Sequence, residues 1–353
     1  MKINIKKLAL LAMAITVFIS CEKDDGGIDI PENYENGYFV TNEGNFGTGN
    51  GSVSFVSHLG GVTNDVFESV NNFALGDVVQ SMNIINDNAY VLVNGSAKIE
   101  VVSVNSMHAL ASIDISSPRY MAQVNYEKAY VTDWGINGVQ VIDLLANTIS
   151  STISCGLGPE GITVANGFAY VCNVGGWGLD NTVTVINTST DAVETTLVVG
   201  DKPNSVVVDI NGAVWVLTGG YTEWNADWTE ILSESAGNLV KIVDNTIEAT
   251  YTFAVGNHPE DLVINDSGTT LYYSDGAWSK AVYSMGIEDS ELPNTPLINK
   301  SFYALGCNNE YIYGTDAVDF SQSGWTFRHT LDGSVVDSVQ VGIGPGGYCF
   351  FKN

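Results

Sequence analysis

The chain has 353 residues, of which 45% are hydrophobic and only 15% are charged, and its 40 acidic side chains outnumber the 13 basic ones. This composition can bury a large core, so it excludes intrinsic disorder, collagen repeats and long charged tails. A formal net charge of −27 repels phosphate backbones and anionic lipids, so we expect neither nucleic-acid binding nor docking on membranes through basic segments.

Residues 1–20 have the pattern of a bacterial signal peptide. Three lysines precede the apolar run 8–19, which is too short to span a bilayer. The run ends in Phe18-Ile19-Ser20-Cys21, and a small residue directly before a cysteine resembles the lipobox of bacterial lipoproteins. The resemblance implies that Cys21 is lipidated and becomes the mature N-terminus. The alternative is an ordinary signal peptide that happens to end near a cysteine.

Residues 21–36 are polar and lack periodicity, which predicts a flexible tether between the anchor and a folded domain. Its segment Glu22-Lys23-Asp24-Asp25 resembles the surface-export signal of certain Gram-negative bacteria, and a solvated linker is the alternative interpretation. We therefore expect a lipid-anchored outer-membrane protein that is exposed at the cell surface.

Internal repetition is the strongest pattern in the rest of the chain. The segment 158–199 holds four short alternating runs separated by turn residues, which predicts four antiparallel strands, A to D. A proline that opens strand A recurs at intervals of 41, 44, 56 and 86 residues, the last being two repeats of 43. These marker prolines are Pro118, Pro159, Pro203, Pro259 and Pro345, and one repeat has lost its proline near Phe302.

The B strand recurs seven times as a triplet that contains Tyr or Trp, beginning at residues 38, 90, 130, 170, 214, 271 and 311. Four strands per repeat at a spacing of roughly 40–50 residues are typical of a β-propeller. We predict an all-β fold, a single seven-bladed β-propeller over residues 37–353. The chain enters on a B strand and leaves on an A strand at 347–351, so the ring is expected to close by pairing of the C-terminal A strand with the N-terminal B, C and D strands.

Tight turns such as Asn166-Gly167 join A to B, so the B-to-C and D-to-A connections share the opposite face of the ring. The predicted B-to-C loops of this face carry Trp134, Trp177, Tyr221, Trp224, Trp228, Trp278 and Phe320. Aromatic side chains gathered on one rim form a platform on which a large flat ligand can stack. In the alternative interpretation they cap the blades. The longest insertion, 218–238, is expected to form a flap over the ring mouth.

The residue after each marker proline is expected to point to the mouth of the central channel. These residues are Arg119, Glu160, Asn204 and Glu260, with Gln80 at the equivalent place in the first repeat. Arg119 is one of only two arginines, so it is a candidate partner for a ligand phosphate or carboxylate. A Glu–Arg network lining a wet channel is the alternative.

Catalytic motifs are missing from the sequence. No Ser-His-Asp set and no phosphate-binding loop before a helix can be assembled, so we expect no enzymatic activity, no cofactor and no metal. The alternative is a hydrolase of the lactonase kind, which would hold Ca²⁺ in the channel through Glu160, Asn204, Glu260 and Asp261.

Four cysteines follow Cys21, namely Cys155, Cys172, Cys307 and Cys349. An exported protein can oxidise them, and Cys307 and Cys349, on A strands of neighbouring blades, are the first pair to consider. Packing of all four as small buried hydrophobic side chains is an equal alternative.

With these features the chain resembles YncE-like propellers, and more closely the BtuG-type surface lipoproteins. The resemblance is carried by residues 38–45, 117–120, 169–176 and 202–204. It implies capture of cobalamin (vitamin B12) on the propeller face and delivery to an outer-membrane TonB-dependent transporter. The alternatives are a surface-layer-like propeller that binds another protein, and the Ca²⁺-dependent hydrolase.

Overall fold

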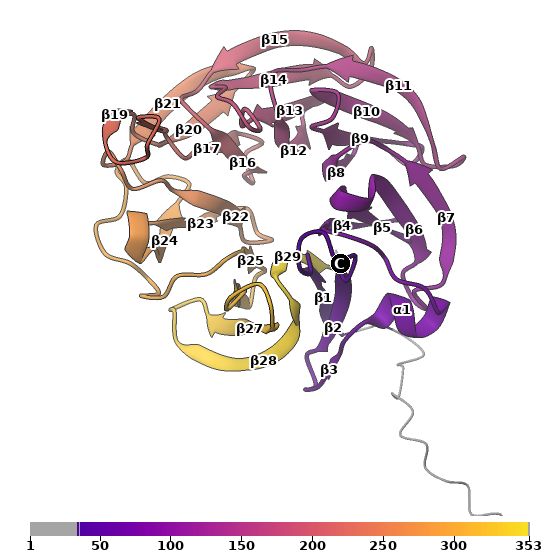
Figure 1. Cartoon of the computed structure of the whole chain (residues 1–353). Coiled ribbons are helices and arrows are strands. Elements are labelled where there is room, and N and C mark those ends of the chain that lie inside the picture. Colours follow the sequence, from indigo (N-terminus) through magenta and orange to yellow (C-terminus); the bar gives the residue numbers. More distant parts are fainter. Residues whose placement is uncertain (1–33, 35, 352–353) are drawn as a thin grey trace, which may run out of the picture. The chain divides into compact units, whose positions relative to one another are not determined.

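The computed structural model describes residue 34 and residues 36–351, which form seven β-sheets arranged in a ring (Figure 1). The prediction of an all-β, seven-bladed propeller is confirmed. The predicted signal peptide, the lipidation site Cys21 and nearly all of the predicted tether lie outside the described residues.

The strands of each blade are given from the centre of the ring outwards. Blade 1 contains β29 (Pro345–Phe350), β1 (Gly37–Asn42), β2 (Ser52–Ser57) and β3 (Val62–Thr63). Blade 2 contains β4 (Val79–Ile85), β5 (Asn88–Val93), β6 (Lys98–Ser103) and β7 (Ala109–Asp114). Blade 3 contains β8 (Pro118–Gln123), β9 (Lys128–Asp133), β10 (Gly138–Asp143) and β11 (Thr148–Ser154). Blade 4 contains β12 (Pro159–Ala165), β13 (Phe168–Asn173), β14 (Thr182–Asn187) and β15 (Ala192–Val198).

Blades 5 to 7 differ from one another in strand number and in insertions more than blades 1 to 4 do. Blade 5 contains β16 (Pro203–Val208), β17 (Val214–Thr218), β20 (Asn238–Val243) and β21 (Thr246–Thr252), and a separate hairpin of β18 (Thr222–Trp224) and β19 (Ile231–Glu234) is inserted between β17 and β20. Blade 6 contains β22 (Glu260–Ile264), β23 (Thr270–Asp275) and β24 (Ala281–Gly286). Blade 7 contains β25 (Leu305–Cys307), β26 (Tyr311–Asp316), β27 (Ser323–Thr330) and β28 (Val335–Ile343).

Blade 1 closes the ring as predicted. β29 pairs antiparallel with β1, so that Tyr38 lies opposite Phe350 and Thr41 opposite Gly347. Because the first and last strands of the propeller share one sheet, neither presents an unpaired edge at the seam.

The core lies between neighbouring blades. Tyr170 and Val185 of blade 4, for example, pack against Val214 and Val216 of blade 5. The second strands from the centre, such as β13 and β17, are covered on both faces, and this is why their sequences are nearly continuous apolar runs rather than alternating ones. The outermost strands, such as β15, are largely exposed.

Blade 6 differs from the prediction of four strands per blade, because a loop replaces its outermost strand in the part of the chain that the structure describes. Only an isolated bridge between Val282 and Ile298 marks the place of that strand. The segment contains Pro293 and Pro296, which have no backbone N–H to donate to a β-ladder.

The disulfide considered between Cys307 and Cys349 is not formed, and no disulfide joins the cysteines of residues 36–351. Cys307 packs between blades 6 and 7, whereas Tyr348 and Phe350 face blade 7, so Cys349 between them faces the other side of its sheet. Cys172, Cys307 and Cys349 are buried, which favours the alternative of small packed side chains. Burial also raises the pKa of the Cys155 thiol to about 12.

Helices in residues 36–351 are few and short: α1 (Val66–Asn71) and the 3₁₀ turns η1 (Asn94–Ser96) and η2 (Ala277–Ser279). α1 lies between β3 and β4 and buries Val66 and Phe67 against the first blades. No helix in the described part of the chain has the length and apolar character of a membrane span.

Candidate ligand-binding site

A recurrent backbone irregularity directs side chains into the middle of the ring. In five blades the innermost strand shifts register within its first residues, as between Pro118 and Met121 or between Pro159 and Ile162. Such a bulge re-aims the side chain that follows it. The five predicted channel residues, Gln80, Arg119, Glu160, Asn204 and Glu260, all line one cavity of 580 Å³, called the channel cavity below.

Arg119 is paired with neighbouring side chains in the channel cavity. Its Nε and Nη2 donate to the two carboxylate oxygens of Glu160 at 2.9 and 2.7 Å, and Nη1 donates to Oε1 of Gln80 at 2.5 Å. The guanidinium carbon also lies 4.4 Å from the centre of the Trp134 ring. The structure therefore contains the Glu–Arg network that the sequence left as the alternative, and the charge of Arg119 is neutralised by Glu160.

The other channel residues are also engaged, with one exception. Glu260 forms an ion pair with Lys280, and the Asn204 amide donates to the Pro259 carbonyl at 3.1 Å. Asp261 is different, because its Oδ2 is sealed from solvent and has no hydrogen-bond partner among the described residues. Burial, reinforced by the nearby Glu260 and opposed by Lys280, raises the pKa of Asp261 to about 8.

No metal centre is apparent in residues 34 and 36–351, since no group of three or more His, Cys, Asp or Glu side chains there is placed to hold a metal ion. Of the four residues considered for Ca²⁺, Glu160 and Glu260 are instead paired with Arg119 and Lys280.

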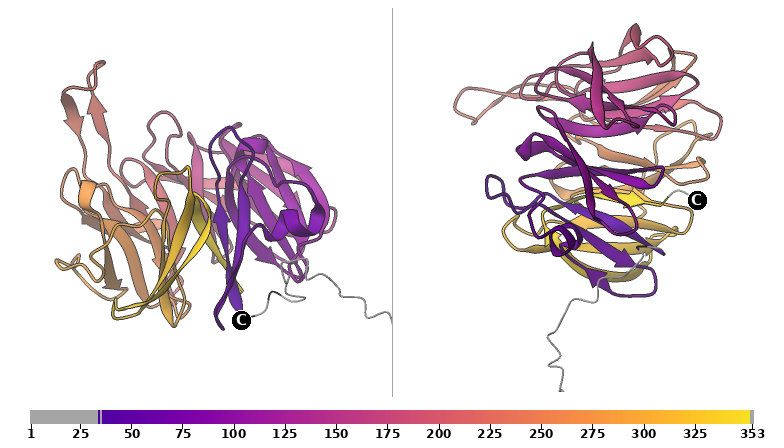
Figure 2. Two further views of the ribbon diagram at one scale, coloured as in Figure 1. Left: turned by 60° about the horizontal axis from the view of Figure 1, so that its bottom comes forward. Right: turned by 90° about the vertical axis from the view of Figure 1, so that its right-hand side faces the viewer.

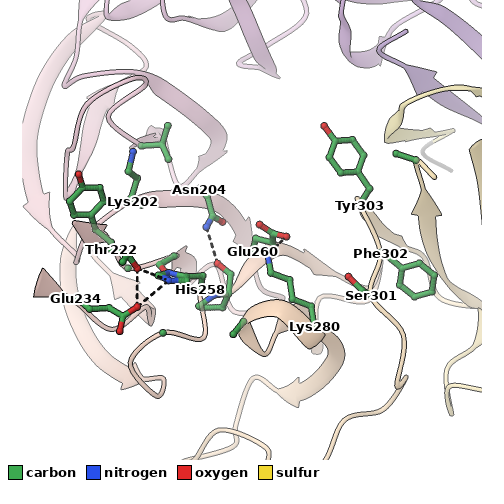
Figure 3. Close-up of a pocket in the computed structure, with 18 of the residues that line it drawn as sticks. Lys202, Asn204, Thr222, Glu234, His258, Glu260, Lys280, Ser301, Phe302 and Tyr303 are labelled. Carbon is green, nitrogen blue, oxygen red and sulfur yellow. Dashed lines mark hydrogen bonds and ion pairs between the residues drawn. The ribbon is translucent and has the colours of Figure 1, made fainter. Parts of the chain in front are cut away.

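Two larger cavities adjoin the channel cavity. The hairpin cavity, of 1110 Å³, extends from the β18–β19 hairpin across blade 6 to blade 7 (Figure 3). The tryptophan cavity, of 970 Å³, lies beside Trp134 and Trp177. Glu260, Tyr303 and Phe320 line both, so the two cavities form neighbouring parts of one broad hollow.

The structure brings together some of the predicted aromatic residues and separates others. Trp134 and Trp177 meet edge to face at 6.3 Å, while Tyr221 and Trp224 line the hairpin cavity. Trp228 lines none of the three cavities; it is 75% exposed and stacks on Trp224 at 6.5 Å. The backbone of Trp278 lies in η2 between β23 and β24, and its side chain lies outside the described atoms. Phe320 meets Tyr303 edge to face at 4.9 Å.

The insertion 218–238 does not cover the ring mouth as predicted. It forms the β18–β19 hairpin, which lies at the periphery in Figure 1 and projects from one face in Figure 2. Its base is fixed to blade 5 because the Ser235 hydroxyl donates to Asp201 at 2.6 Å and the Tyr221 N–H donates to Ser235 Oγ at 3.0 Å. The hairpin is therefore a wall of the hairpin cavity and not a flap.

A family model described as a domain of unknown function, DUF5074, matches residues 36–330. The chain belongs to the DUF5074 family. No curated protein is significantly similar to it in sequence.

Solved propellers resemble this DUF5074 protein in fold. A quinonprotein alcohol dehydrogenase-like protein of Bacteroides thetaiotaomicron has a TM-score of 0.66 and 16% identity, covering 90% of this chain and 79% of that one. A putative 6-phosphogluconolactonase of Bacteroides fragilis has a TM-score of 0.60 and 9% identity, covering 90% and 99%. A functionally unknown protein of Desulfotomaculum acetoxidans has a TM-score of 0.60 and 16% identity, covering 89% and 98%. At these identities the likeness shows the fold alone.

Two residues of the DUF5074 site have no assigned role in the sequence analysis, Lys202 and His258. Each directly precedes a marker proline, and each has a left-handed backbone, with φ of 58° and 53°. The His258 ring is fixed between Thr222 Oγ1 at 3.0 Å and the Gly219 carbonyl at 2.8 Å. In blades 5 and 6 the residue before the marker proline therefore lines the hairpin cavity, whereas glycines stand at this place before Pro159 and Pro345.

Proposed function

We propose that this DUF5074 protein is a lipid-anchored, surface-exposed binding protein that captures a large nutrient molecule, a cobalamin or related corrinoid, for an outer-membrane TonB-dependent transporter. The observation that carries the proposal is the hollow of two adjoining cavities, of 1110 and 970 Å³, on one face of a rigid ring. Cavities for small ligands usually measure about 300–1,000 Å³, so the hollow suits a ligand at the large end of that class.

The lining of the hollow supports the same ligand class. Aromatic side chains line both parts of the hollow, Trp134 and Trp177 in the tryptophan cavity and Tyr221 and Trp224 in the hairpin cavity. Amide groups of Asn94 and Asn137 line the tryptophan cavity. A corrinoid has a flat macrocycle that can pack against such rings, and many amide side chains that exchange hydrogen bonds with amides and carboxylates.

The remaining parts of the proposal rest on the sequence and on the charge pairing in the channel. The lipobox-like motif that ends at Cys21 and the polar segment 21–36 support a lipid anchor at the outer membrane. Pairing of Arg119 with Glu160 and of Glu260 with Lys280 supports binding without catalysis or cofactor, because these groups hold one another.

Calorimetric titration of the full-length protein in mild detergent with cyanocobalamin tests the proposal, with a glycan mixture as control. We expect submicromolar binding of the corrinoid and none of the glycans. A natively folded protein that binds no corrinoid at all would overturn the assignment.

A second candidate function is supported by the tip of the β18–β19 hairpin. Trp228 is 75% exposed and Leu232 is 58% exposed, and both belong to a segment that projects from the ring. Exposed apolar groups on a projecting element are typical of contacts with another protein. In that case Trp228→Ser with Leu232→Ser would abolish a detergent-stable complex at the cell surface while the corrinoid affinity of the purified protein stays unchanged.

A further inference from the structure

Lys202 is the one Lys or Arg of the described residues that has no carboxylate partner. The other seven form ion pairs, namely Lys98–Glu100, Arg119–Glu160, Lys128–Asp191, Lys241–Glu248, Lys280–Glu260, Lys300–Asp316 and Arg328–Asp337. With 40 acidic side chains against 13 basic ones in the chain, carboxylates are plentiful. An unpaired lysine is therefore a conspicuous exception.

The surroundings of Lys202 leave part of its hydrogen-bonding capacity unused. Its Nζ donates to the Gly178 carbonyl at 2.6 Å and lies 5.8 Å from the centre of the Tyr221 ring. An ammonium group has three N–H donors, so donors remain for a further acceptor. Partial burial lowers the pKa of Lys202, and no neighbouring carboxylate offsets this effect.

Lys202 lines the hairpin cavity, and there the acidic residues already have partners (Figure 3). Glu234 accepts a hydrogen bond from Thr222 at 2.9 Å and lies 3.6 Å from His258 Nε2. Glu260 is paired with Lys280, and Asp316 with Lys300. Of the two lysines that line this cavity, Lys280 is paired with Glu260, whereas Lys202 has no carboxylate partner.

We propose that Lys202 binds an anionic group of the ligand, a phosphate or a carboxylate, inside the hairpin cavity. An ammonium group bonded to a charged oxygen is held more strongly than one bonded to a neutral carbonyl. Tyr221 and Trp224 line the same cavity, so the part of the ligand next to its anion is expected to be flat or apolar. Lys202 thus takes the role of anion partner that was predicted for Arg119. Arg119 itself is bonded to Glu160 and Gln80.

The inference rests on the proposed function only in its first experiment, which uses corrinoids as ligands. Cyanocobalamin carries one phosphodiester, and dicyanocobinamide is a corrinoid without it. Calorimetry compares both on the full-length protein and on Lys202→Met, Lys202→Arg and Lys241→Met. The last removes the same charge from a residue that lines none of the three cavities.

We expect Lys202→Met to weaken cyanocobalamin binding roughly 10-fold to 100-fold, the effect of losing one charged hydrogen bond. Dicyanocobinamide binding should stay unchanged, Lys202→Arg should retain most of the affinity, and Lys241→Met should match the unmodified protein. Equal weakening of both corrinoids, or no weakening of either, would overturn the inference.

A second probe separates this inference from the proposed function. Phenyl phosphate and benzoate combine a ring with the two anions, and phenol has the ring alone. If the unmodified protein binds no corrinoid, the proposed function fails, and quenching of tryptophan fluorescence by these probes still decides the role of Lys202. Quenching by either anion but not by phenol, and its loss in Lys202→Met, supports the inference. Absence of any difference between anions and phenol refutes it.

Discussion

The channel cavity and the hairpin cavity share Asn204 and Glu260, yet they use charge in opposite ways. In the channel, Arg119 is held by Glu160 and Gln80, which come from the neighbouring strands β12 and β4. In the hairpin cavity, Lys202 donates to a backbone carbonyl and lies near the Tyr221 ring, and it has no carboxylate partner.

In this propeller, the position of a charged residue determines whether a carboxylate of the protein neutralises it or whether it remains available to a ligand. Side chains of neighbouring innermost strands face one another across a narrow space, so opposite charges there neutralise each other. Lys202 instead lies on the connection before β16, beside the insertion 218–238, where no carboxylate reaches it. We therefore expect the channel network to support stability and the hairpin cavity to support binding.

Arg119→Met breaks the channel network, and we expect this substitution to change stability the most. Arg119→Met leaves Glu160, whose side chain is only 10% exposed, without its partner, and removing one member of a buried pair costs about 3–5 kcal/mol. Urea denaturation measures this loss. Lys202→Met serves as the control and should stay within about 0.5 kcal/mol of the unmodified protein. Equal stability of the two variants would show that the channel network contributes no more to stability than Lys202 does.

The next prediction concerns how the stability of the protein depends on pH through Asp261 in the channel. The pKa of Asp261 is raised from an ordinary 3.8 to about 8 by burial, so between these values the folded protein holds a proton that the unfolded chain has lost. This contribution lowers stability as pH rises, by at most about 1.4 kcal/mol per pH unit.

Asp261→Asn removes that contribution, because the amide does not ionise. The stability of the variant relative to the unmodified protein should therefore increase between about pH 5 and pH 7, measured by urea denaturation at each pH. A difference that is constant with pH would show that Asp261 is ionised throughout this range.

A smaller effect is expected in the wall of the hairpin cavity. Trp224→Ala removes an aromatic ring that lines the cavity and should weaken ligand binding by about 1–2 kcal/mol. Calorimetry with cyanocobalamin measures it, and the thermal midpoint checks that the fold is intact. Unchanged affinity would exclude this ring from the binding surface.

The smallest effect is expected at the hairpin tip. Trp228 lines no cavity and contacts Trp224 by stacking, so Trp228→Ala should reduce ligand affinity by no more than about 0.5–1 kcal/mol. The same titration compares it with Trp224→Ala. If Trp228→Ala had the larger effect, the ligand would sit on the tip and not in the cavity.

Local patterns were sufficient for the architecture. The repeated marker prolines and Tyr- or Trp-containing triplets belong to strands that pair with their neighbours in the chain, so the sequence alone predicted seven blades. The closure through β29 and β1 joins the two ends of the propeller, and it was predicted because the chain enters on a B strand and leaves on an A strand. It also placed Gln80, Arg119, Glu160, Asn204 and Glu260 in one cavity, because a residue at the same position of each repeat occupies the same position in the ring.

Which of these side chains already have an ion-pair or hydrogen-bond partner follows only from the folded ring. The pairing of Arg119 with Glu160, the isolation of Lys202 and the outward projection of the β18–β19 hairpin depend on groups from different blades. Distances between blades arise only when the ring is closed, and charge pairing falls off steeply with distance. Sequence periodicity therefore determined the scaffold, while the availability of each charged group was set by its neighbours in space.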